Sequence, residues 1–173
     1  YIFDGVQTGP YTEVDPPNPL NSYGRSKLAG EQAIAASGVA HLILRTSWVY
    51  GSRGRNFLLT MRHLASEREE LKVVNDQIGA PTWSRLVAEA TAQALARLLD
   101  PSGGFPEVRS GIYHLTAAGE TSWHGFAKMI LELTQAKTRL LAIPSSAHPV
   151  VAPRPRNSRL SNEKFAATFG LRL

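Results

Sequence analysis

Short apolar runs alternate with longer amphipathic segments along this chain, and this alternation restricts its fold more than any other feature. The apolar runs have the length and residue types of β-strands and lie at residues 1–3, 41–44, 71–74, 111–115 and 140–143. The segments with helical spacing of apolar residues lie at residues 23–37, 56–68, 84–99, 122–135 and 161–170. Strands that alternate with helices predict an α/β fold with parallel pairing.

Capping and helix-breaking residues set the expected limits of these elements. Ser22 is suited to cap the first helix, and Gly38 is suited to end it. Ser161 is suited to cap the last helix in the same way. Loops are predicted where Pro and Gly cluster, at residues 6–22, 75–83 and 100–109.

Composition excludes several classes of protein. Hydrophobic residues make up 43% of the 173 residues, which is enough for a packed interior and argues against intrinsic disorder. No apolar run approaches the length of about 18 residues that suggests a membrane span, and residues 1–5 lack the pattern of a signal peptide. The chain has no cysteine, which excludes disulfides and thiolate metal sites and is compatible with a reducing compartment.

The net charge of +5 raises the question of a polyanionic partner. Basic residues are spread along the chain, and the densest group is Arg154, Arg156 and Arg159. Neither a zinc-finger spacing nor an aromatic RNA-binding motif accompanies them, so we expect no nucleic-acid partner. A solvated surface is the first interpretation, and a pocket for a small phosphorylated ligand is the second. The five histidines show no metal-ligand spacing, so no metal is expected from them.

Tyr23 and Lys27 form the most informative pair in the sequence. A spacing of four residues puts both on one helical face, about 6 Å apart along the axis. A phenol normally titrates near pH 10 and is a poor acid or base at neutral pH. A nearby ammonium lowers that pKa, so the pair could donate and recover a proton near the working pH. The same spacing is common on helix surfaces, so an ordinary surface pair is the alternative interpretation.

The order of strands and helices also predicts where a ligand would bind. In parallel α/β sheets, ligands bind beyond the carboxyl ends of the strands. On this basis Asp4 and the segments 45–51 and 75–81 should share one functional edge. Asp4 precedes Gly5, and we interpret it as shaping a turn rather than as a catalytic group.

Six motifs occur in order along the chain. They are Tyr-Ile-Phe-Asp-Gly at 1–5, Tyr-Gly-Arg-Ser-Lys within 19–31, Arg-Thr-Ser-Trp-Val-Tyr-Gly at 45–51, Gly-Ala-Pro-Thr within 75–82, Gly-Ile-Tyr-His-Leu at 111–115 and Arg-Pro-Arg-Asn-Ser at 154–158. The first two are typical of extended short-chain dehydrogenases/reductases. The tryptophan, Gly-Ala-Pro-Thr and Arg-Pro-Arg-Asn-Ser segments make the chain resemble the dTDP-4-dehydrorhamnose reductase family.

The resemblance implies a partial Rossmann-like parallel sheet flanked by helices, with a small α/β substrate-binding lobe. Residues 1–100 would be the C-terminal part of the Rossmann-like catalytic domain with interleaved substrate-binding segments. Residues 101–173 would mainly form the substrate-binding lobe. The implied reaction is cytoplasmic reduction, by NADPH, of the C4 ketone of dTDP-4-dehydro-L-rhamnose to dTDP-L-rhamnose. It involves no membrane.

The resemblance also assigns residues. Tyr23 would protonate the developing alkoxide, while Lys27 would lower the pKa of this phenol and bind the nicotinamide ribose. Both residues would therefore touch the cofactor. Trp48 holds a position that contacts the sugar nucleotide in the family, and a core aromatic is the alternative. Arg154 and Arg156 could bind the diphosphate or form salt bridges in a loop. Arg85 stands where some members have a glutamate for a dimer-bridging Mg²⁺, so no metal is expected there.

The chain departs from the family pattern in one large respect. It contains no Gly-rich turn for a pyrophosphate, and the family's catalytic Ser or Thr would fall just before Tyr1. We therefore expect a fragment without its main cofactor-binding region, inactive alone and prone to associate, with itself or with the missing half, through exposed strand edges. Two alternatives stay open: a non-catalytic regulatory or binding module of the superfamily, and a related nucleotide-sugar epimerase or dehydratase.

Overall fold

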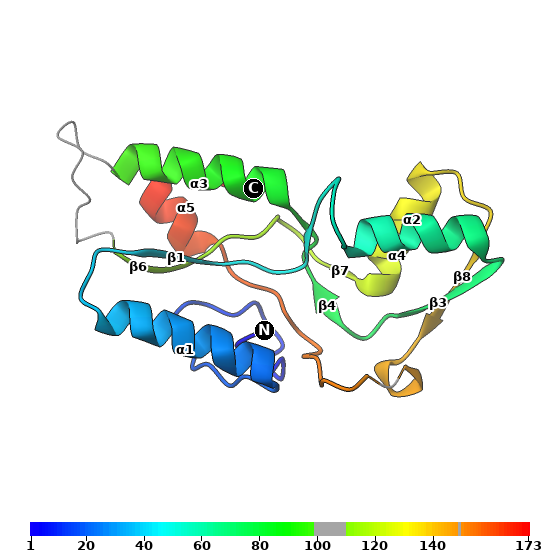
Figure 1. Cartoon of the computed structure of the whole chain (residues 1–173), viewed down its shortest axis with the longest axis horizontal. Helices are drawn as coiled ribbons and strands as arrows, with labels where there is room; N and C mark the ends of the chain where they lie inside the picture. The colour runs from blue at the N-terminus through cyan, green and yellow to red at the C-terminus, as the bar shows by residue number, and fades with distance from the viewer. Residues whose placement is uncertain (99–109, 149) are drawn as a thin grey trace.

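The computed structural model describes residues 1–98, 110–148 and 150–173 and confirms the α/β fold (Figure 1). Its helices are α1 (Ser22–Ala36), α2 (Phe57–Glu67), α3 (Ser84–Leu98), α4 (Trp123–Leu133) and α5 (Glu163–Phe169), with a 3₁₀ turn at Ser145–Ala147. Its strands are β1 (Leu42–Arg45), β2 (Val49–Tyr50), β3 (Glu70–Val74), β4 (Ile78–Gly79), β5 (Thr82–Trp83), β6 (Gly111–His114), β7 (Thr121–Ser122) and β8 (Arg139–Ile143). None of the helices in these described ranges is both long and apolar enough to cross a bilayer.

One lobe is built on the parallel pair β1 and β6, in which Leu42 faces Gly111 and Arg45 faces His114. Helices α3 and α5 lie on one side of this pair and α1 on the other (Figure 1). The core of the lobe joins α3, β6 and α5 through Ala90, Ala94, Leu98, Tyr113, Leu115, Phe165 and Phe169. Within the described residues β1 has β6 as its one neighbour, so association through its other edge stays a prediction.

The second lobe is built on the parallel pair β3 and β8, over which α2 and α4 pack (Figure 1). Its core consists of Met61, Leu71, Val73, Ala127, Ile130 and Leu131. Two short pairs lie between the lobes, β2 with β5 in parallel and β4 with β7 antiparallel. Each lobe takes segments from both sides of residue 100. The division of the chain near that residue stays a prediction.

Two helices begin at residues other than those predicted from the sequence, and hydrogen bonds at their N-termini explain the differences. Asn21, not Ser22, caps α1, because extended Asn21 accepts a hydrogen bond from the Gly24 amide at 2.9 Å while Ser22 is already helical. The predicted cap at Ser161 is also wrong. Asn162 holds the cap position of α5, and its side chain instead accepts a hydrogen bond from the Thr116 amide at 2.9 Å.

Other element boundaries in the structure either agree with the predicted ones or differ from them in detail. Gly38 and Gly170 have φ angles of +72° and +61°, as expected of glycines that follow helices. The strand predicted at residues 1–3 is wrong: these residues form no strand, and they are apolar because Ile2 and Phe3 are buried in a small cluster with Tyr11. The segment predicted as a loop at 75–83 contains the short strands β4 and β5. Each is two residues long, which is too short for an alternating pattern to be visible in the sequence. The connection predicted at 100–109 lies outside the described residues.

Candidate active site

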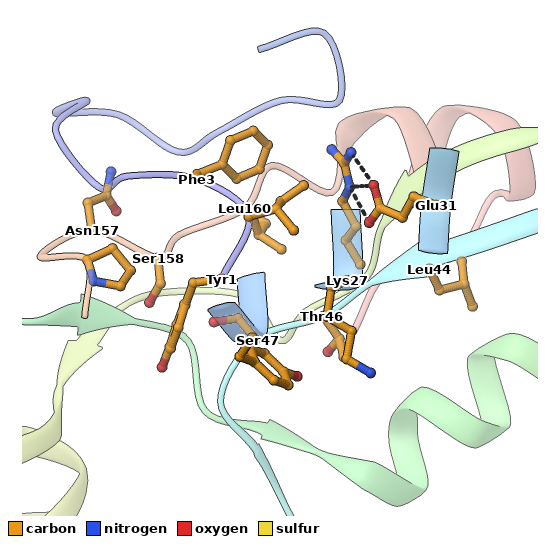
Figure 2. A pocket seen from close by; sticks show the side chains of 14 residues that line it. Tyr1, Phe3, Lys27, Glu31, Leu44, Thr46, Ser47, Asn157, Ser158 and Leu160 are labelled. Carbon is orange, nitrogen blue, oxygen red and sulfur yellow. Dashed lines mark hydrogen bonds and ion pairs between the residues drawn. The ribbon is translucent and has the colours of Figure 1, made fainter. Parts of the chain in front are cut away.

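A pocket of about 290 Å³ lies at the carboxyl end of β1 (Figure 2). Its walls come from the N-terminal residues, one face of α1, the end of β1 and the segment 155–160. The lining residues are Tyr1, Ile2, Phe3, Tyr23, Lys27, Glu31, Leu44, Arg45, Thr46, Ser47, Pro155, Asn157, Ser158 and Leu160. The pocket therefore occupies the position at which parallel α/β sheets bind ligands.

Tyr23 and Lys27 meet in this pocket, as their spacing predicted. The Lys27 Nζ lies 5.4 Å from the centroid of the Tyr23 ring, and the Tyr23 side chain is 60% exposed. Gly24 sets the position of this part of α1, because a Cβ there would collide with the Tyr1 carbonyl oxygen and lie 2.8 Å from Pro19 Cβ. The first turn of α1 is thus held directly against the first residues of the chain.

A buried ion pair lies one helical turn beyond Lys27. Arg45 donates from Nε to both Glu31 carboxylate oxygens at 3.0 and 3.2 Å and from Nη2 to Oε2 at 2.7 Å (Figure 2). The side chains are only 8% and 13% exposed. Both residues lie in the motifs described above, but the sequence did not predict that they form an ion pair. The available signals were a charged residue at the end of an apolar strand and a carboxylate at helical spacing from Tyr23 and Lys27.

Two further lining residues present polar groups to the pocket. The Ser47 hydroxyl is buried and has no hydrogen-bond partner among the described residues. Burial raises the pKa of the Tyr1 phenol, while the nearby positive charge of Arg154 opposes that shift. An unpartnered buried hydroxyl costs free energy unless a ligand or water satisfies it. Ser47 is therefore a candidate ligand contact that sequence reasoning did not single out.

Trp48 does not line this pocket. Its side chain is 7% exposed and stacks on Trp123 with centroids 3.6 Å apart and planes 7° apart. Its φ of +49° is in the left-handed region, which is uncommon for a bulky residue. These features agree with the core aromatic that the sequence left open, and the contact with a sugar nucleotide stays a prediction.

Phe3, which lines the pocket, packs against a buried group of rings. Phe3 stacks on Tyr11 at 4.3 Å and meets His114 edge-on at 5.9 Å. His114 is fully buried, with Nδ1 lying 3.1 Å from the Tyr11 carbonyl oxygen. Burial lowers the pKa of His114, Glu13 opposes this shift and Arg45 adds to it. Burial of this histidine therefore disfavours its protonated form.

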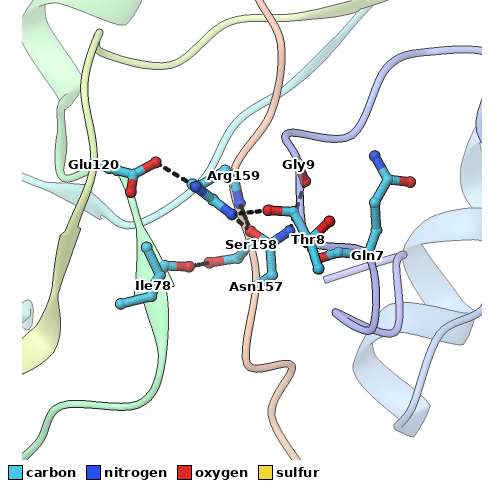
Figure 3. Close-up of polar contacts among 8 residues, drawn as sticks. All are labelled: Gln7, Thr8, Gly9, Ile78, Glu120, Asn157, Ser158 and Arg159. Atoms are coloured by element: carbon cyan, nitrogen blue, oxygen red, sulfur yellow. Dashed lines mark hydrogen bonds and ion pairs between the residues drawn. The ribbon is translucent and has the colours of Figure 1, made fainter.

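The segment 156–161, which we call the strap, links the N-terminal loop at residues 7–9 to strand β4 and to Glu120 (Figure 3). On one side Asn157 Nδ2 donates to the carbonyl oxygens of Gln7 and Gly9, both at 2.7 Å. On the other side the Ser158 amide donates to the Ile78 carbonyl at 2.9 Å. Arg159 reaches both sides, since its guanidinium contacts Glu120 and the Thr8 carbonyl oxygen. The strap therefore brings the 75–81 segment next to the pocket without making it a wall.

A second cavity of about 500 Å³ lies in the other lobe. Its lining is apolar on α2 and β3 and basic at several positions: Phe57, Met61, Leu64, Arg68, Glu70, Leu71, Lys72, Val73, Val74, Trp123, His148 and Arg154. Arg154 lines this cavity, and its positive charge also acts on the Tyr1 phenol of the first pocket. Arg156 lines neither of them.

The remaining candidates are structural. Asp4 accepts hydrogen bonds from the Val6 amide at 3.1 Å and the Tyr11 hydroxyl at 2.8 Å, which confirms its role in a turn. Arg85 pairs with Glu89 at 2.8 Å. Within the described parts of the chain, no three His, Asp or Glu side chains are grouped so that they could hold a metal ion.

Comparisons with known proteins agree with this geometry. A family model described as the RmlD substrate binding domain matches residues 1–173. The dTDP-4-dehydrorhamnose reductase of Burkholderia thailandensis is 50% identical over 183 residues, covering 100% of this chain and 60% of that protein. The crystal structure of such a reductase from Clostridium acetobutylicum matches with a TM-score of 0.87 at 34% identity, over 99% of this chain and 58% of its own. That of the Bacillus anthracis reductase, in complex with NADP, matches with a TM-score of 0.85, 34% identity and the same coverage.

Proposed function

This chain belongs to the RmlD substrate-binding-domain family, and we propose that it supplies the proton donor and the sugar-nucleotide site of an NADPH-dependent dTDP-4-dehydrorhamnose reductase. The chain spans about three-fifths of the length of the relatives it matches. We propose the activity for this chain when it is joined to a dinucleotide-binding segment. The reaction would take place in the cytoplasm.

The meeting of Tyr23 and Lys27 in the first pocket is the observation that carries this proposal. Reduction of a ketone places negative charge on its oxygen, and that oxygen must receive a proton. The exposed Tyr23 hydroxyl donates it, and the Lys27 ammonium stabilises the phenolate that remains. Solvent access to Tyr23 then allows the proton to be replaced between turnovers.

The pocket fits the reacting end of a nicotinamide cofactor. Lys27 can bind ribose hydroxyls, and the unpartnered Ser47 hydroxyl can pair with a polar group of the ring substituent. The hydride is the chemistry that NADPH would supply when bound. A Gly-rich turn for the pyrophosphate is not in this sequence, so a dinucleotide-binding segment joined to this chain would have to hold the rest of the cofactor.

The second cavity suits the nucleotide part of the substrate. Its apolar floor, which includes Phe57 and Trp123, can cover a base, and Arg154 lies where it can reach a diphosphate. Trp48 stacks on Trp123 and follows Ser47 in sequence, so it would border the sugar between the two hollows. We keep the substrate contact of Trp48 as part of this proposal.

The test uses what we call the completed protein. In it, this chain is preceded by a dinucleotide-binding segment, taken from the native gene where it encodes one or otherwise from the Burkholderia thailandensis relative. NADPH oxidation is followed with dTDP-4-dehydro-L-rhamnose as substrate. The unmodified protein should turn over, and Tyr23→Phe should lower kcat by about 100-fold or more because the proton donor is lost. Calorimetry should still detect binding of dTDP-rhamnose by that variant.

Tyr50→Phe is the matched control, because it removes a phenol hydroxyl from β2 outside the pocket. It should turn over at a rate within about twofold of the unmodified protein. Near-normal turnover by Tyr23→Phe would refute the proton-donor assignment. Absence of any turnover by the unmodified completed protein, with dTDP-rhamnose still bound, would instead favour a binding module.

A further inference from the structure

Helix α1 places three ionisable groups on one face, because Tyr23, Lys27 and Glu31 follow one another at intervals of four residues. All three line the first pocket. A lysine and a glutamate four residues apart on a helix are close enough to form an ion pair. Among the residues that the structure describes, Lys27 forms none, and its ammonium instead lies beside the Tyr23 ring.

Glu31 is bonded to Arg45 instead of Lys27. The Arg45 guanidinium occupies both carboxylate oxygens of Glu31 through three hydrogen bonds. Arg45 is the last residue of β1, which is fixed by its pairing with β6, and its guanidinium also lies 5.4 Å from the Phe3 ring. The bidentate geometry and the burial of both side chains hold the carboxylate in place.

We propose that Arg45 is a positioning residue that keeps Glu31 away from Lys27, so that the Lys27 ammonium remains available to Tyr23. This inference rests on the proposed function, in which the ammonium stabilises the Tyr23 phenolate. A carboxylate paired with Lys27 would cancel much of that stabilisation. The phenol would then be a weaker acid and would deliver its proton more slowly.

The other charged and titratable groups around this face do not replace Arg45. Tyr1 lies across the pocket, with Arg154 near its phenol. The terminal ammonium of Tyr1 is near both Glu31 and Lys27, but in the completed protein this nitrogen is an uncharged amide. His114 lies beneath, next to Glu13, and burial disfavours its protonated form. Arg45 is the one cation that the structure, in its described ranges, shows bonded to Glu31.

The first experiment removes Arg45 in the completed protein. Arg45→Met keeps a long apolar side chain against Phe3 and frees Glu31. We expect kcat at neutral pH to fall by roughly three- to tenfold. In a plot of kcat against pH, the alkaline limb, where kcat falls as Tyr23 loses its proton, should move to higher pH by about one unit. The double variant Arg45→Met/Glu31→Gln should return the limb to its original position, because the freed carboxylate is gone. Arg85→Met, which breaks an exposed Arg–Glu pair on α3, is the matched control and should leave the limb in place.

The second experiment leaves the buried pair intact. Gly30 lies in α1 three residues after Lys27, and a Cβ there would meet nothing within 4 Å. Gly30→Glu should place a free carboxylate beside Lys27 and move the limb in the same direction, whereas Gly30→Gln should not. This pair of variants applies even if Arg45→Met fails to fold.

A direct readout separates this inference from the proposed function. Tyrosinate absorbance during a pH titration, with the Tyr23→Phe signal subtracted, follows the Tyr23 phenol without turnover. Its transition should move to higher pH in Arg45→Met and in Gly30→Glu, and should return in the double variant. An unmoved transition in Gly30→Glu, or a double variant that stays as shifted as Arg45→Met, would overturn the inference. Loss of reductase activity in the unmodified protein would overturn the proposed function alone.

Discussion

Gly79 in β4 makes room for the buried indole of Trp48. A Cβ at this position would lie 2.6 Å from Trp48 Nε1 and 2.7 Å from Ser158 Oγ, and closer still to Trp48 Cε2. The φ angle of Gly79 is not in the left-handed region, so alanine could adopt the same backbone conformation. The effect of Gly79→Ala is therefore the collision of one methyl group with the indole and the strap.

The size of this effect follows from what must move. Forcing a methyl group into a packed site costs about 1–3 kcal/mol. Displacement of Trp48 would also weaken its stacking on Trp123, which contributes about 0.5–1.5 kcal/mol. We expect the free energy of unfolding to fall by about 2–4 kcal/mol. With a urea dependence of about 2 kcal/mol per molar, the unfolding midpoint would fall by about 1–2 M.

Gly30→Ala is the matched control, because it adds the same methyl group inside α1 where a Cβ meets nothing. It should raise the free energy of unfolding by up to about 1 kcal/mol through helix propensity. Equilibrium urea unfolding followed by tryptophan fluorescence measures both variants. If Gly79→Ala unfolds within about 0.5 kcal/mol of the unmodified chain while Gly30→Ala is stabilised, the proposed close packing of Trp48 is wrong.

Two further predictions concern the buried group of rings and the strap. The folded chain disfavours protonation of His114, so the unfolded chain binds the proton first as the pH falls below about 6.5. Stability should therefore decrease from about pH 6.5 downward, by at most about 1.4 kcal/mol per pH unit from this group, and urea midpoints of His114→Gln should show a flatter dependence. Asn157→Ala should lower the free energy of unfolding by about 1–3 kcal/mol, because the carbonyls of Gln7 and Gly9 lose their donor. Asn18→Ala is the control, because it removes one exposed hydrogen bond to Asp4. Calorimetric unfolding measures both variants. Equal decreases in the free energy of unfolding would contradict the linking role proposed for Asn157.

The sequence was sufficient for the elements that local rules determine. The four longer helices and four of the five predicted strands lie close to their predicted positions because each has an apolar pattern several residues long. The cap of α1 was misplaced by one residue, since Asn21 and Ser22 are both good caps and the backbone decides between them. Strands β4 and β5 were missed because two residues carry no pattern.

The candidate site was predictable only in the part that lies within one helix. Tyr23 and Lys27 share a face of α1, so their meeting follows from spacing alone. The buried position of Trp48 could not be predicted, because it depends on Trp123, which lies far away in sequence on α4. The role of the strap was also hidden, since the partners of Asn157 are backbone carbonyls about 150 residues earlier, and every residue type offers a carbonyl.

The candidate chemistry depends on one local feature, the spacing of residues in α1, and on one non-local feature, a contact between α1 and β1. The identity of the reacting pair is encoded within five consecutive residues of α1. The charge environment of that pair depends on Arg45, which reaches Glu31 from a neighbouring strand. A short motif match therefore establishes which groups are present, while the availability of Lys27 depends on a contact between elements that no local pattern records. A helix with the same Tyr and Lys but without a cation at the end of β1 would leave Glu31 free to pair with Lys27, and the reacting pair would then be a weaker proton donor.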